Sequence, residues 1–465
     1  MAHLRMRSIL AAAVQRLRGR RQTATRLEGL TCIPVTVESV VNLEGPGEFR
    51  ATLLERIANA RERILISALY LQDDTAGREV LAAIYAASAV RPELQIAIFV
   101  DWHRAQRGLV GKAASPGNAA LYVEMARRLG PGVPIYGVPV QSREWMGVMH
   151  LKGFVIDDAL LYSGASINDV YLQRFDRYRL DRYHLIENRA LADSIAGLMT
   201  RILQTNTAVR RLDVEPQAKT GSLRGAIVGL RRVLARSRYA ITAGSVGNGE
   251  VGITPLLGFG HRDNQLNAVI LQLIKRTERR LVVFTPYFNL PGPIRRALEG
   301  RLRRRCRVTI IVGDKTANDF YISPEDPFKT IGALPYLYES NLRRFCKTHQ
   351  GDIDEGLLDV HLWSHERHSF HLKGLLSDDD YALLTGSNLN PRAWRLDLEN
   401  GLLIHDPQGG LHGQHQAELG RILARTRRLD HHTALDDTGT YPVPVQRILK
   451  RLARTRADRL LNQVL

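Results

Sequence analysis

Short apolar runs alternate with amphipathic segments along most of the chain. Ile64–Tyr70 (ILISALY) and Leu281–Tyr287 (LVVFTPY) are largely apolar, and runs of about six residues are typical of buried strands. Phe49–Ala60 and Ala268–Arg276 instead carry apolar residues at helical spacing. Strands that alternate with helices predict an α/β fold, in which helices flank mixed sheets.

The predicted strands fall into two related sets. Ile64–Tyr70 resembles Leu281–Tyr287 at a separation of 217 residues, and Ile96–Asp101 resembles Val308–Asp314. The chain has 465 residues and is 44% hydrophobic, so it can bury two cores. The repeat predicts one fold used twice, in two similar domains. We expect a basic N-terminal segment at 1–30, domains at 31–210 and 211–430, and a basic amphipathic segment at 431–465.

Composition adds a charged partner to this picture. The formal net charge is +18, which requires a polyanionic partner or substrate; nucleic acid and anionic lipid both qualify. The three cysteines are scattered and odd in number, which favours a reducing cytoplasm over a disulfide framework. No apolar run approaches the ~20 residues that a membrane span requires.

Both ends of the chain are basic. At the start, a short apolar stretch runs into four arginines within residues 16–21, which favours an amphipathic helix over a signal peptide. In the C-terminal segment, apolar residues at helical spacing oppose basic ones; they are Val445, Ile448, Leu449 and Leu452 against Arg447, Lys450, Arg451 and Arg454. This pattern predicts a helix on an anionic membrane surface. The alternative is a solvated basic helix that packs on its own domain.

One short motif occurs twice, once in each predicted domain. MHLKGFVID contains His150, Lys152 and Asp157, and FHLKGLLSD contains His371, Lys373 and Asp378. Only nine of the 65 basic residues are Lys, yet both motifs carry Lys, which indicates a need for a compact ammonium. Each His–Lys pair is predicted on a strand, where side chains two residues apart share a face.

Two such half-sites predict a single active site at the domain interface. Two ammonium groups can neutralise the oxygens of one phosphoryl group, so the chemistry needs no metal. One imidazole can attack phosphorus while the other transfers protons. The acids Asp157 and Asp378 precede further strand residues, and they are better explained as turn and packing residues than as metal ligands.

Further polar residues accompany each motif. The turns YSGASIN and LTGSNLN carry Ser166, Asn168, Asn388 and Asn390, which can bind phosphate oxygens or simply cap a turn. Each histidine also needs a carboxylate to fix its tautomer. RLDLEN aligns with RLDRYH, and we expect a crossed arrangement in which Glu399 serves His150 and Asp181 serves His371.

These residues resemble a known family. The duplicated motif is that of the phospholipase D superfamily, and longer blocks resemble the bacterial type I phosphatidylserine synthases; they include VDWHRAQRG, YSGASINDVYL, DRYHLI, TPYFNLP, VGDKTANDFYI, IGALPYLYE and NPRAWRLDLEN. The resemblance covers roughly residues 35–465. It implies two phospholipase D-like domains and transfer of phosphatidyl from CDP-diacylglycerol to L-serine, with CMP as the second product and no cofactor.

The resemblance also implies roles for individual residues. His150 becomes the nucleophile that forms a phosphatidyl-histidine, and His371 becomes the general acid and base. Lys152 and Lys373 become phosphate ligands, with Asp157 and Asp378 in support. One departure is that superfamily members often read Gly-Ser-x-Asn after the motif, whereas the first half has GASIN, so Ser166 and Asn168 compete for the role of phosphate ligand.

Two loops are candidates for substrate contacts. DWHRAQRG and GDKTANDFY follow matching strands and should lie at the same end of the two sheets. Contacts to cytidine, pyrophosphate or serine are assigned to Trp102, His103, Arg104, Arg107, Lys315, Asn318, Asp319 and Tyr321. The alternative is that these residues hold the domain junction.

Other functions stay open at this stage. The chain could be a cardiolipin synthase, phospholipase or nuclease of the same superfamily, or a non-catalytic protein that binds nucleic acid or ribosomes through its charge. Matched histidines argue against simple binding, because binding alone needs no imidazoles. The expected location is the cytoplasm, with peripheral attachment to the inner face of the bacterial membrane.

Overall fold

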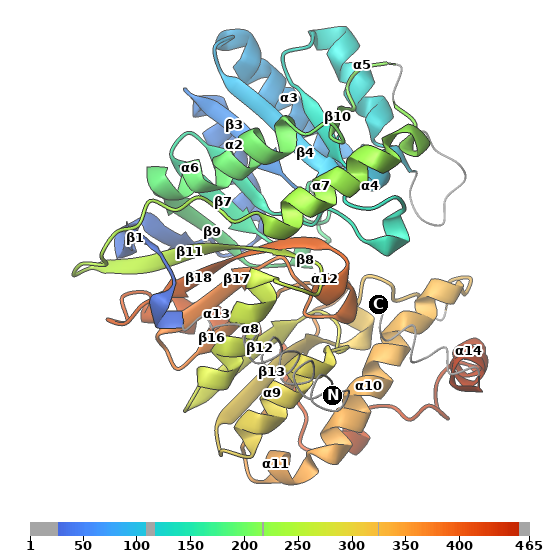
Figure 1. Cartoon of the computed structure of the whole chain (residues 1–465). Coiled ribbons are helices and arrows are strands. Elements are labelled where there is room, and N and C mark those ends of the chain that lie inside the picture. The colour runs from blue at the N-terminus through green and yellow to red at the C-terminus, as the bar shows by residue number, and fades with distance from the viewer. Residues whose placement is uncertain (1–26, 108–116, 216–217, 324, 455–465) are drawn as a thin grey trace, which may run out of the picture.

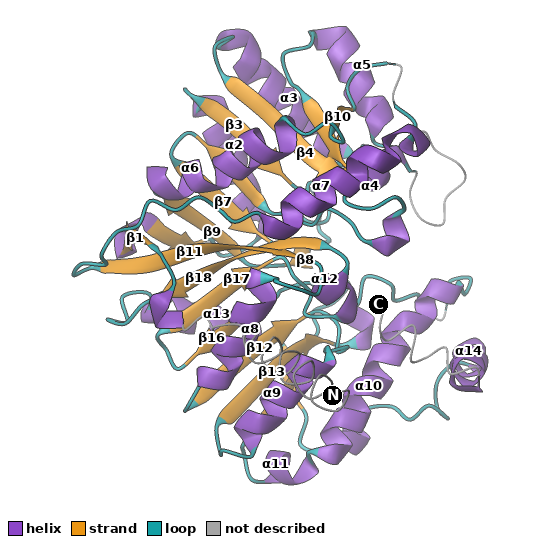
Figure 2. Ribbon diagram, viewed as in Figure 1, coloured by secondary structure: helices purple, strands orange, loops and turns teal. Residues whose placement is uncertain are grey.

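Two mixed sheets form the core of the molecule in a computed structural model, which describes residues 27–107, 117–215, 218–323 and 325–454. Figure 1 shows one half in blue to green and the other in yellow to red, and Figure 2 shows helices on the faces of both sheets. This is the α/β architecture that the apolar pattern predicts. Residues 1–26, which make up most of the predicted basic N-terminal segment, lie outside the described residues.

The first sheet has eight strands. In spatial order they are β10 (Arg210–Arg211), β5 (Ile135–Val138), β4 (Gln95–Asp101), β3 (Arg63–Ser67), β6 (Gly153–Ile156), β7 (Ala159–Ser163), β9 (Tyr183–Glu187) and β2 (Val40–Asn42). Strands β3, β4 and β5 are parallel, and β6 returns antiparallel to β3. The motif that contains His150 therefore precedes a central strand.

The second sheet repeats this order with nine strands. They are β1 (Ile33–Thr36), β11 (Glu250–Phe259), β18 (Leu398–His405), β17 (Tyr381–Thr385), β16 (Gly374–Ser377), β12 (Arg280–Thr285), β13 (Arg307–Gly313), β14 (Leu358–Trp363) and β19 (Thr426–Arg428). β12, β13 and β14 are parallel, and β16 is antiparallel to β12. The two sheets thus share one topology around both motifs.

The structure departs from the predicted domain boundaries in more than one place. β10 (Arg210–Arg211) spans the expected boundary but lies in the first sheet, and α7 (Arg224–Arg236) lies with the first half. β1 falls within the expected first domain, yet it pairs with β11 of the second sheet. A short third sheet also links the halves, because β8 (Arg179–Leu180) pairs with β15 (Ser369–Phe370). The two halves are therefore linked twice, by β1 and by the β8–β15 pair, which ends next to His371.

The helices follow from the apolar spacing. α2 (Pro46–Asn59) buries Phe49, Leu53 and Ile57, which are four residues apart and so share one face. The other helices of the first half are α3 (Thr75–Val90), α4 (Trp102–Gln106), α5 (Ala119–Leu129), α6 (Arg189–Leu198) and α7 (Arg224–Arg236). The second half contains α8 (Gln265–Arg276), α9 (Gly292–Leu302), α10 (Leu334–Thr348), α11 (Gln350–Asp354), α12 (Pro391–Arg395), α13 (His412–Leu423) and α14 (Val443–Arg454).

The C-terminal helix α14 packs on its own half. Val445 is buried, and Ile448 and Leu449 lie against a small cluster that contains Ala333 and Tyr336. The apolar stripe therefore follows the alternative expected from the sequence, a basic helix packed on its own domain, and its apolar face is not free for lipid. Residues 455–465 of the predicted segment lie outside the described residues. Within the described part of the chain, no helix is both long and apolar enough to span a membrane.

Candidate active site

The two His–Lys pairs lie just before strands rather than within them. β6 begins at Gly153 and β16 at Gly374, one residue after each motif lysine. Both glycines have positive φ, 138° and 139°, a conformation that side chains disfavour. The prediction that each pair lies on a strand is therefore wrong, because the strand begins only at the glycine after the lysine, where the backbone has a positive φ.

Each motif segment instead bonds to the other half of the molecule. The backbone N–H of His150 donates to the carbonyl of Leu398 at 2.8 Å, and that of His371 donates to the carbonyl of Leu180 at 2.8 Å. The residues that follow these carbonyls are Glu399 and Asp181. This backbone crossing brings a carboxylate from one half to the histidine of the other.

Both crossed carboxylate contacts expected from the sequence are present. His150 Nδ1 lies 2.8 Å from Glu399 Oε2, and His371 Nδ1 lies 3.0 Å from Asp181 Oδ2. All four side chains are buried, with at most 7% exposure. A carboxylate at Nδ1 places the ring proton there and leaves Nε2 with a lone pair.

The sequence alignment behind that expectation matched the RLD triplets of RLDRYH and RLDLEN, which places Asp181 opposite Asp397. The structure shifts this alignment by two residues. Ser163 pairs with Tyr183 and Thr385 pairs with Gly401 across equivalent strands. Because Ser163 and Thr385 occupy the same place in the two repeats, Asp181 corresponds to Glu399 and not to Asp397. The carboxylate of Asp397 instead accepts a bond from the backbone of Val148 and pairs with Arg392.

The two motif lysines are buried but have different partners. Lys373 Nζ donates to Asp181 Oδ2 at 2.8 Å and contacts His371 Nδ1. Lys152 Nζ donates to the hydroxyl of Ser166 at 3.2 Å. Their exposed fractions are 0% and 1%. Two buried amino groups, each a cation when protonated, can form the positive centre that an anionic phosphodiester needs.

Glycines in the turns after each motif make room for these lysines. A Cβ atom on Gly164 would lie 2.8 Å from Lys373 Nζ, and one on Gly386 would lie 2.9 Å from Lys152 Cγ. Each lysine therefore packs against the turn of the opposite half. A single site results, and both halves contribute to each wall.

Burial and mutual repulsion lower the pKa of the basic groups. For His371, burial and the charge of Lys373 lower the pKa to about 4. Burial and the charges of Lys152 and Lys373 also lower the pKa of His150. The pKa of Lys152 falls to about 7, because burial and Lys373 oppose its charge. Both imidazoles are thus neutral in the empty site at neutral pH.

The two carboxylates have opposite pKa shifts. Burial, with Asp397 nearby, raises the pKa of Glu399. Burial also acts to raise the pKa of Asp181, but the charge of Lys373 and the hydrogen bond from His371 outweigh it and lower the pKa. Asp181 is therefore the more firmly ionised of the two partners.

The motif aspartates lie at the opposite end of each strand from the lysines. The carboxylate of Asp157 accepts bonds from the backbone N–H groups of 61–63, and that of Asp378 accepts bonds from those of 278–280. Both residues have a positive φ of about 50°. They stabilise turns at the start of β3 and β12, which fits the supporting role and not a direct part in chemistry.

The turn residues divide between the centre and a capping role. Ser166 contacts Lys152 directly, whereas Asn168 and Asn390 accept bonds from the backbone N–H three residues later. Asn388 Oδ1 is buried without a hydrogen-bond partner among the described residues. Ser166 and Asn388 occupy equivalent places in the two repeats, so these two are the stronger candidates for phosphate ligands.

A cavity of about 730 Å³ is lined by residues of both halves, among them Arg179 and Asp319; no motif histidine or lysine is among its lining residues. Of the eight predicted loop residues, Arg104, Arg107, Asp319 and Tyr321 line it, and so does Asn168 from the turn after the first motif. The other four do not: Trp102 is buried and donates to Thr220, His103 contacts the carbonyl of Gln141, Lys315 pairs with Glu339, and Asn318 Oδ1 accepts a bond from the N–H of Phe320. These four side chains make their contacts within the protein, which agrees with the structural alternative given for them.

Sequence reasoning missed a network around His371. The hydroxyl of Tyr171 lies 2.9 Å from His371 Nδ1, and the guanidinium of Arg179 lies 4.6 Å from the centre of the Tyr171 ring. Arg179 pairs with Asp319 at 2.8 Å, and the Tyr287 hydroxyl donates to Asp319 at 2.9 Å. Tyr171 and Tyr287 both lie in the quoted blocks YSGASINDVYL and TPYFNLP, which was the available signal.

The chain has similar counterparts among known proteins. The chain is 47% identical over 441 residues to the CDP-diacylglycerol–serine O-phosphatidyltransferase PssA of Escherichia coli, across 94% of this chain and 97% of that protein. A second such transferase, from Haemophilus influenzae, is 46% identical over 94% of this chain and 97% of its own length. The chain belongs to the CDP-diacylglycerol–serine O-phosphatidyltransferase family. This confirms the family indicated by the sequence.

The fold of this family is also confirmed. The crystal structure of phosphatidylserine synthase from Haemophilus influenzae Rd KW20 matches with a TM-score of 0.92 at 45% identity, over 94% of this chain and 98% of that chain. A family model described as "Cardiolipin synthase, PLD-like domain" matches residues 270–423. That range contains the His371 motif and Glu399, whereas the His150 motif lies in the half that the model does not match.

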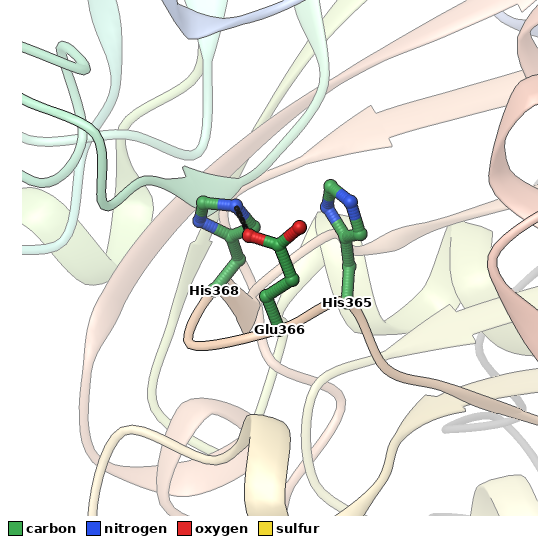
Figure 3. Close-up of side chains that lie close together, drawn as sticks. All are labelled: His365, Glu366 and His368. Carbon is green, nitrogen blue, oxygen red and sulfur yellow. Dashed lines mark ion pairs between the residues drawn. The ribbon is translucent and has the colours of Figure 1, made fainter.

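A separate polar cluster of the second half lies against Tyr178 of the first half. Figure 3 shows His365, Glu366 and His368, whose potential ligand atoms lie within 4.8 Å of one another. The backbone N–H of Tyr178 donates to His368 Nδ1, which places the proton of the neutral ring on Nε2, toward Glu366. A nitrogen that carries a proton cannot bind a metal. The metal-independent chemistry expected from the sequence stays a prediction.

Proposed function

We propose that the chain transfers the phosphatidyl group of CDP-diacylglycerol to L-serine, giving phosphatidylserine and CMP. The observation that carries this proposal is the pair of crossed His–carboxylate contacts beside two buried lysines. The relatives named for this reaction support the choice of substrates. In this proposal the two histidines act in turn on the same phosphorus atom, and neither needs a cofactor.

The first half-reaction uses His150 as the nucleophile. Its Nδ1 is anchored by Glu399, so Nε2 can attack phosphorus. The new P–N bond replaces the P–O bond to CMP, and a phosphatidyl-histidine forms. The phosphate of CMP has a pKa near ~6, so CMP leaves with little help from a proton. Lys152 and Lys373 stabilise the negative oxygens during transfer.

The second half-reaction uses His371 as a general base. The serine hydroxyl attacks phosphorus, its proton passes to His371, and the P–N bond to His150 breaks. A pKa of about 4 leaves the His371 imidazole neutral at neutral pH, as a base must be, and a bound anionic phosphodiester raises this pKa toward that of an effective base. General base catalysis contributes about 10²- to 10⁴-fold, and a poorly acidic alcohol depends on it most.

The test is an assay with labelled CDP-diacylglycerol, with and without serine, that scores CMP, phosphatidylserine and phosphatidic acid. We expect phosphatidylserine to form only with serine and CMP to appear in equal amount. The variant H150A is the control and should form neither. Phosphatidic acid as the main product in both conditions would identify a phospholipase, and absence of turnover would favour a binding protein.

We also propose that the protein attaches peripherally to anionic membranes through its basic surface. Arg447 and Lys450 are exposed on α14, while its apolar face packs against the protein. The attraction should therefore be electrostatic and sensitive to salt. The double variant R447E/K450E should sediment less with anionic liposomes than the parent chain, and equal sedimentation would contradict the proposal. Binding of nucleic acid or ribosomes through the same charge stays a prediction.

A further inference from the structure

We infer that Asp319 and Arg179 form the subsite for the zwitterionic part of serine, with Asp319 taking the α-ammonium and Arg179 the α-carboxylate. This inference rests on the proposed function and extends it to the choice of acceptor. The two residues come from different halves of the chain, since Arg179 belongs to β8 and Asp319 follows β13. Both line the 730 Å³ cavity.

Asp319 is a carboxylate that the phosphoryl chemistry does not need. Asp181 and Glu399 already hold the two histidines, and a third negative charge beside an anionic phosphodiester opposes binding of that substrate. A cationic group of the acceptor would offset this cost. The α-ammonium of serine is such a group, and water, the competing acceptor, has none.

The position of the pair fits an acceptor that must reach His371. Arg179 lies over the ring of Tyr171, whose hydroxyl is 2.9 Å from His371 Nδ1. The charge of Asp319 is close enough to affect the pKa of His371. In serine, two carbons separate the ammonium nitrogen from the hydroxyl oxygen. An ammonium at Asp319 would therefore place that hydroxyl near the base that must take its proton.

The pair is built rather than incidental. Asp319 and Arg179 keep only 11% and 16% side-chain exposure, and their ion pair spans 2.8 Å. The hydroxyl of Tyr287 donates to the other oxygen of Asp319, and Arg179 Nε lies 3.3 Å from Ser369 Oγ. A fixed pair of opposite charges is complementary to a zwitterion and discriminates against acceptors that lack either charge.

During transfer the subsite forms no covalent bond itself. The serine oxygen bonds to phosphorus, the P–N bond to His150 breaks with its electrons returning to the imidazole, and the hydroxyl proton passes to His371. Asp319 and Arg179 hold the acceptor while this occurs. Their loss should therefore weaken serine use and spare the first half-reaction, in which serine takes no part.

The experiment compares two reactions of the full-length protein. The first is serine-dependent formation of phosphatidylserine; the second is exchange of labelled CMP into CDP-diacylglycerol without serine. For D319N we expect the KM for serine to rise about 10- to 100-fold, the loss typical of a charged hydrogen bond, while exchange stays within about twofold. The matched control D176N removes an exposed carboxylate that does not line the cavity and should change neither reaction.

Acceptor analogues separate the two charges. In the D319N variant, the preference for serine over 3-hydroxypropanoate, which lacks the ammonium, should shrink. In R179Q, the preference for serine over ethanolamine, which lacks the carboxylate, should shrink. The conservative variant D319E should use serine better than D319N does. An unchanged KM in D319N, or equal loss of exchange and transfer, would overturn the subsite. Absence of exchange in the unmodified protein would instead overturn the proposed function.

Discussion

The two half-sites share a motif but connect its lysine differently. In the second half, Lys373 and His371 both bond to one carboxylate, Asp181. In the first half, Glu399 bonds to His150, while Lys152 donates to the hydroxyl of Ser166. The two halves thus place the histidine and lysine alike, but the partner of the lysine differs: it is the carboxylate of Asp181 in one half and the neutral hydroxyl of Ser166 in the other.

This difference fits unequal roles for equivalent histidines. His371 lies in a network with Asp181, Lys373 and Tyr171, which can redistribute charge when the imidazole takes a proton. Glu399 holds Nδ1 of His150, and in the proposed mechanism Nε2 is then the nitrogen that attacks phosphorus. A base benefits from a firmly ionised neighbour, whereas a nucleophile mainly needs orientation.

The largest expected contrast is between the variants H150A and H371A. Without His150 no covalent intermediate can form, so turnover should fall by a factor on the order of 10⁴ or more. Without His371 the intermediate should form but react slowly with serine, a loss of about 10²- to 10⁴-fold. Denaturation in detergent at mildly alkaline pH, where the P–N bond of a phosphatidyl-histidine survives, traps labelled phosphatidyl-enzyme and measures both. Rapid chase of the trapped label by serine in H371A would contradict the assignment.

The next contrast is between the two carboxylates. D181N removes the charge that Lys373 needs and leaves a buried ammonium unpaired, which should cost about 3 to 5 kcal/mol of unfolding free energy. Turnover should also fall, on the order of 10²-fold or more, because His371 loses its orienting anion. E399Q keeps a neutral hydrogen bond to His150, so its turnover should fall only about tenfold.

Urea unfolding and pH profiles of turnover test this pair of variants together. The unequal partners predict that D181N is the more damaging in both measurements. Equal stability losses would mean that Lys373 does not depend on Asp181. Near-normal turnover and a normal pH profile in both variants would remove the crossed carboxylates from the mechanism altogether.

The crossed site was predictable because duplication supplies two copies of one constraint. Each motif histidine requires a carboxylate, and matching DRYH with DLEN in the two halves suggested where to find it, although the triplets align two residues away from the true register. The strand expected at His150 and Lys152 begins only at Gly153, whose backbone has a positive φ. Backbone conformation at one glycine is not visible in an apolar pattern.

The network of Arg179 and Asp319 was beyond the sequence for a different reason. Arg179 and Asp319 meet only because β8 and β15 pair across the halves, a contact between segments far apart in the chain. The apolar stripe on α14 shows the same limit. Its spacing predicts an amphipathic helix correctly, but spacing cannot tell whether lipid or Tyr336 covers the apolar face.

The smallest expected effect concerns the two lysines and pH. Lys152 has a pKa of about 7, so in the empty site its ammonium is present below that pH and is lost above it. A bound phosphodiester favours the charged form and raises this pKa. Affinity for CDP-diacylglycerol should therefore be highest below pH 7 and fall by up to about tenfold per unit as pH rises above it.

The variant K152R tests whether this lysine is the source of that dependence. Arginine stays protonated throughout, so K152R should bind more weakly overall but lose the decline above pH 7. The apparent KM for CDP-diacylglycerol, measured from about pH 6 to about pH 9, reports the difference. Lys373, which is paired with Asp181, should contribute little to the slope. A decline of equal steepness in K152R would move the titration to another group and weaken the contrast between the two half-sites.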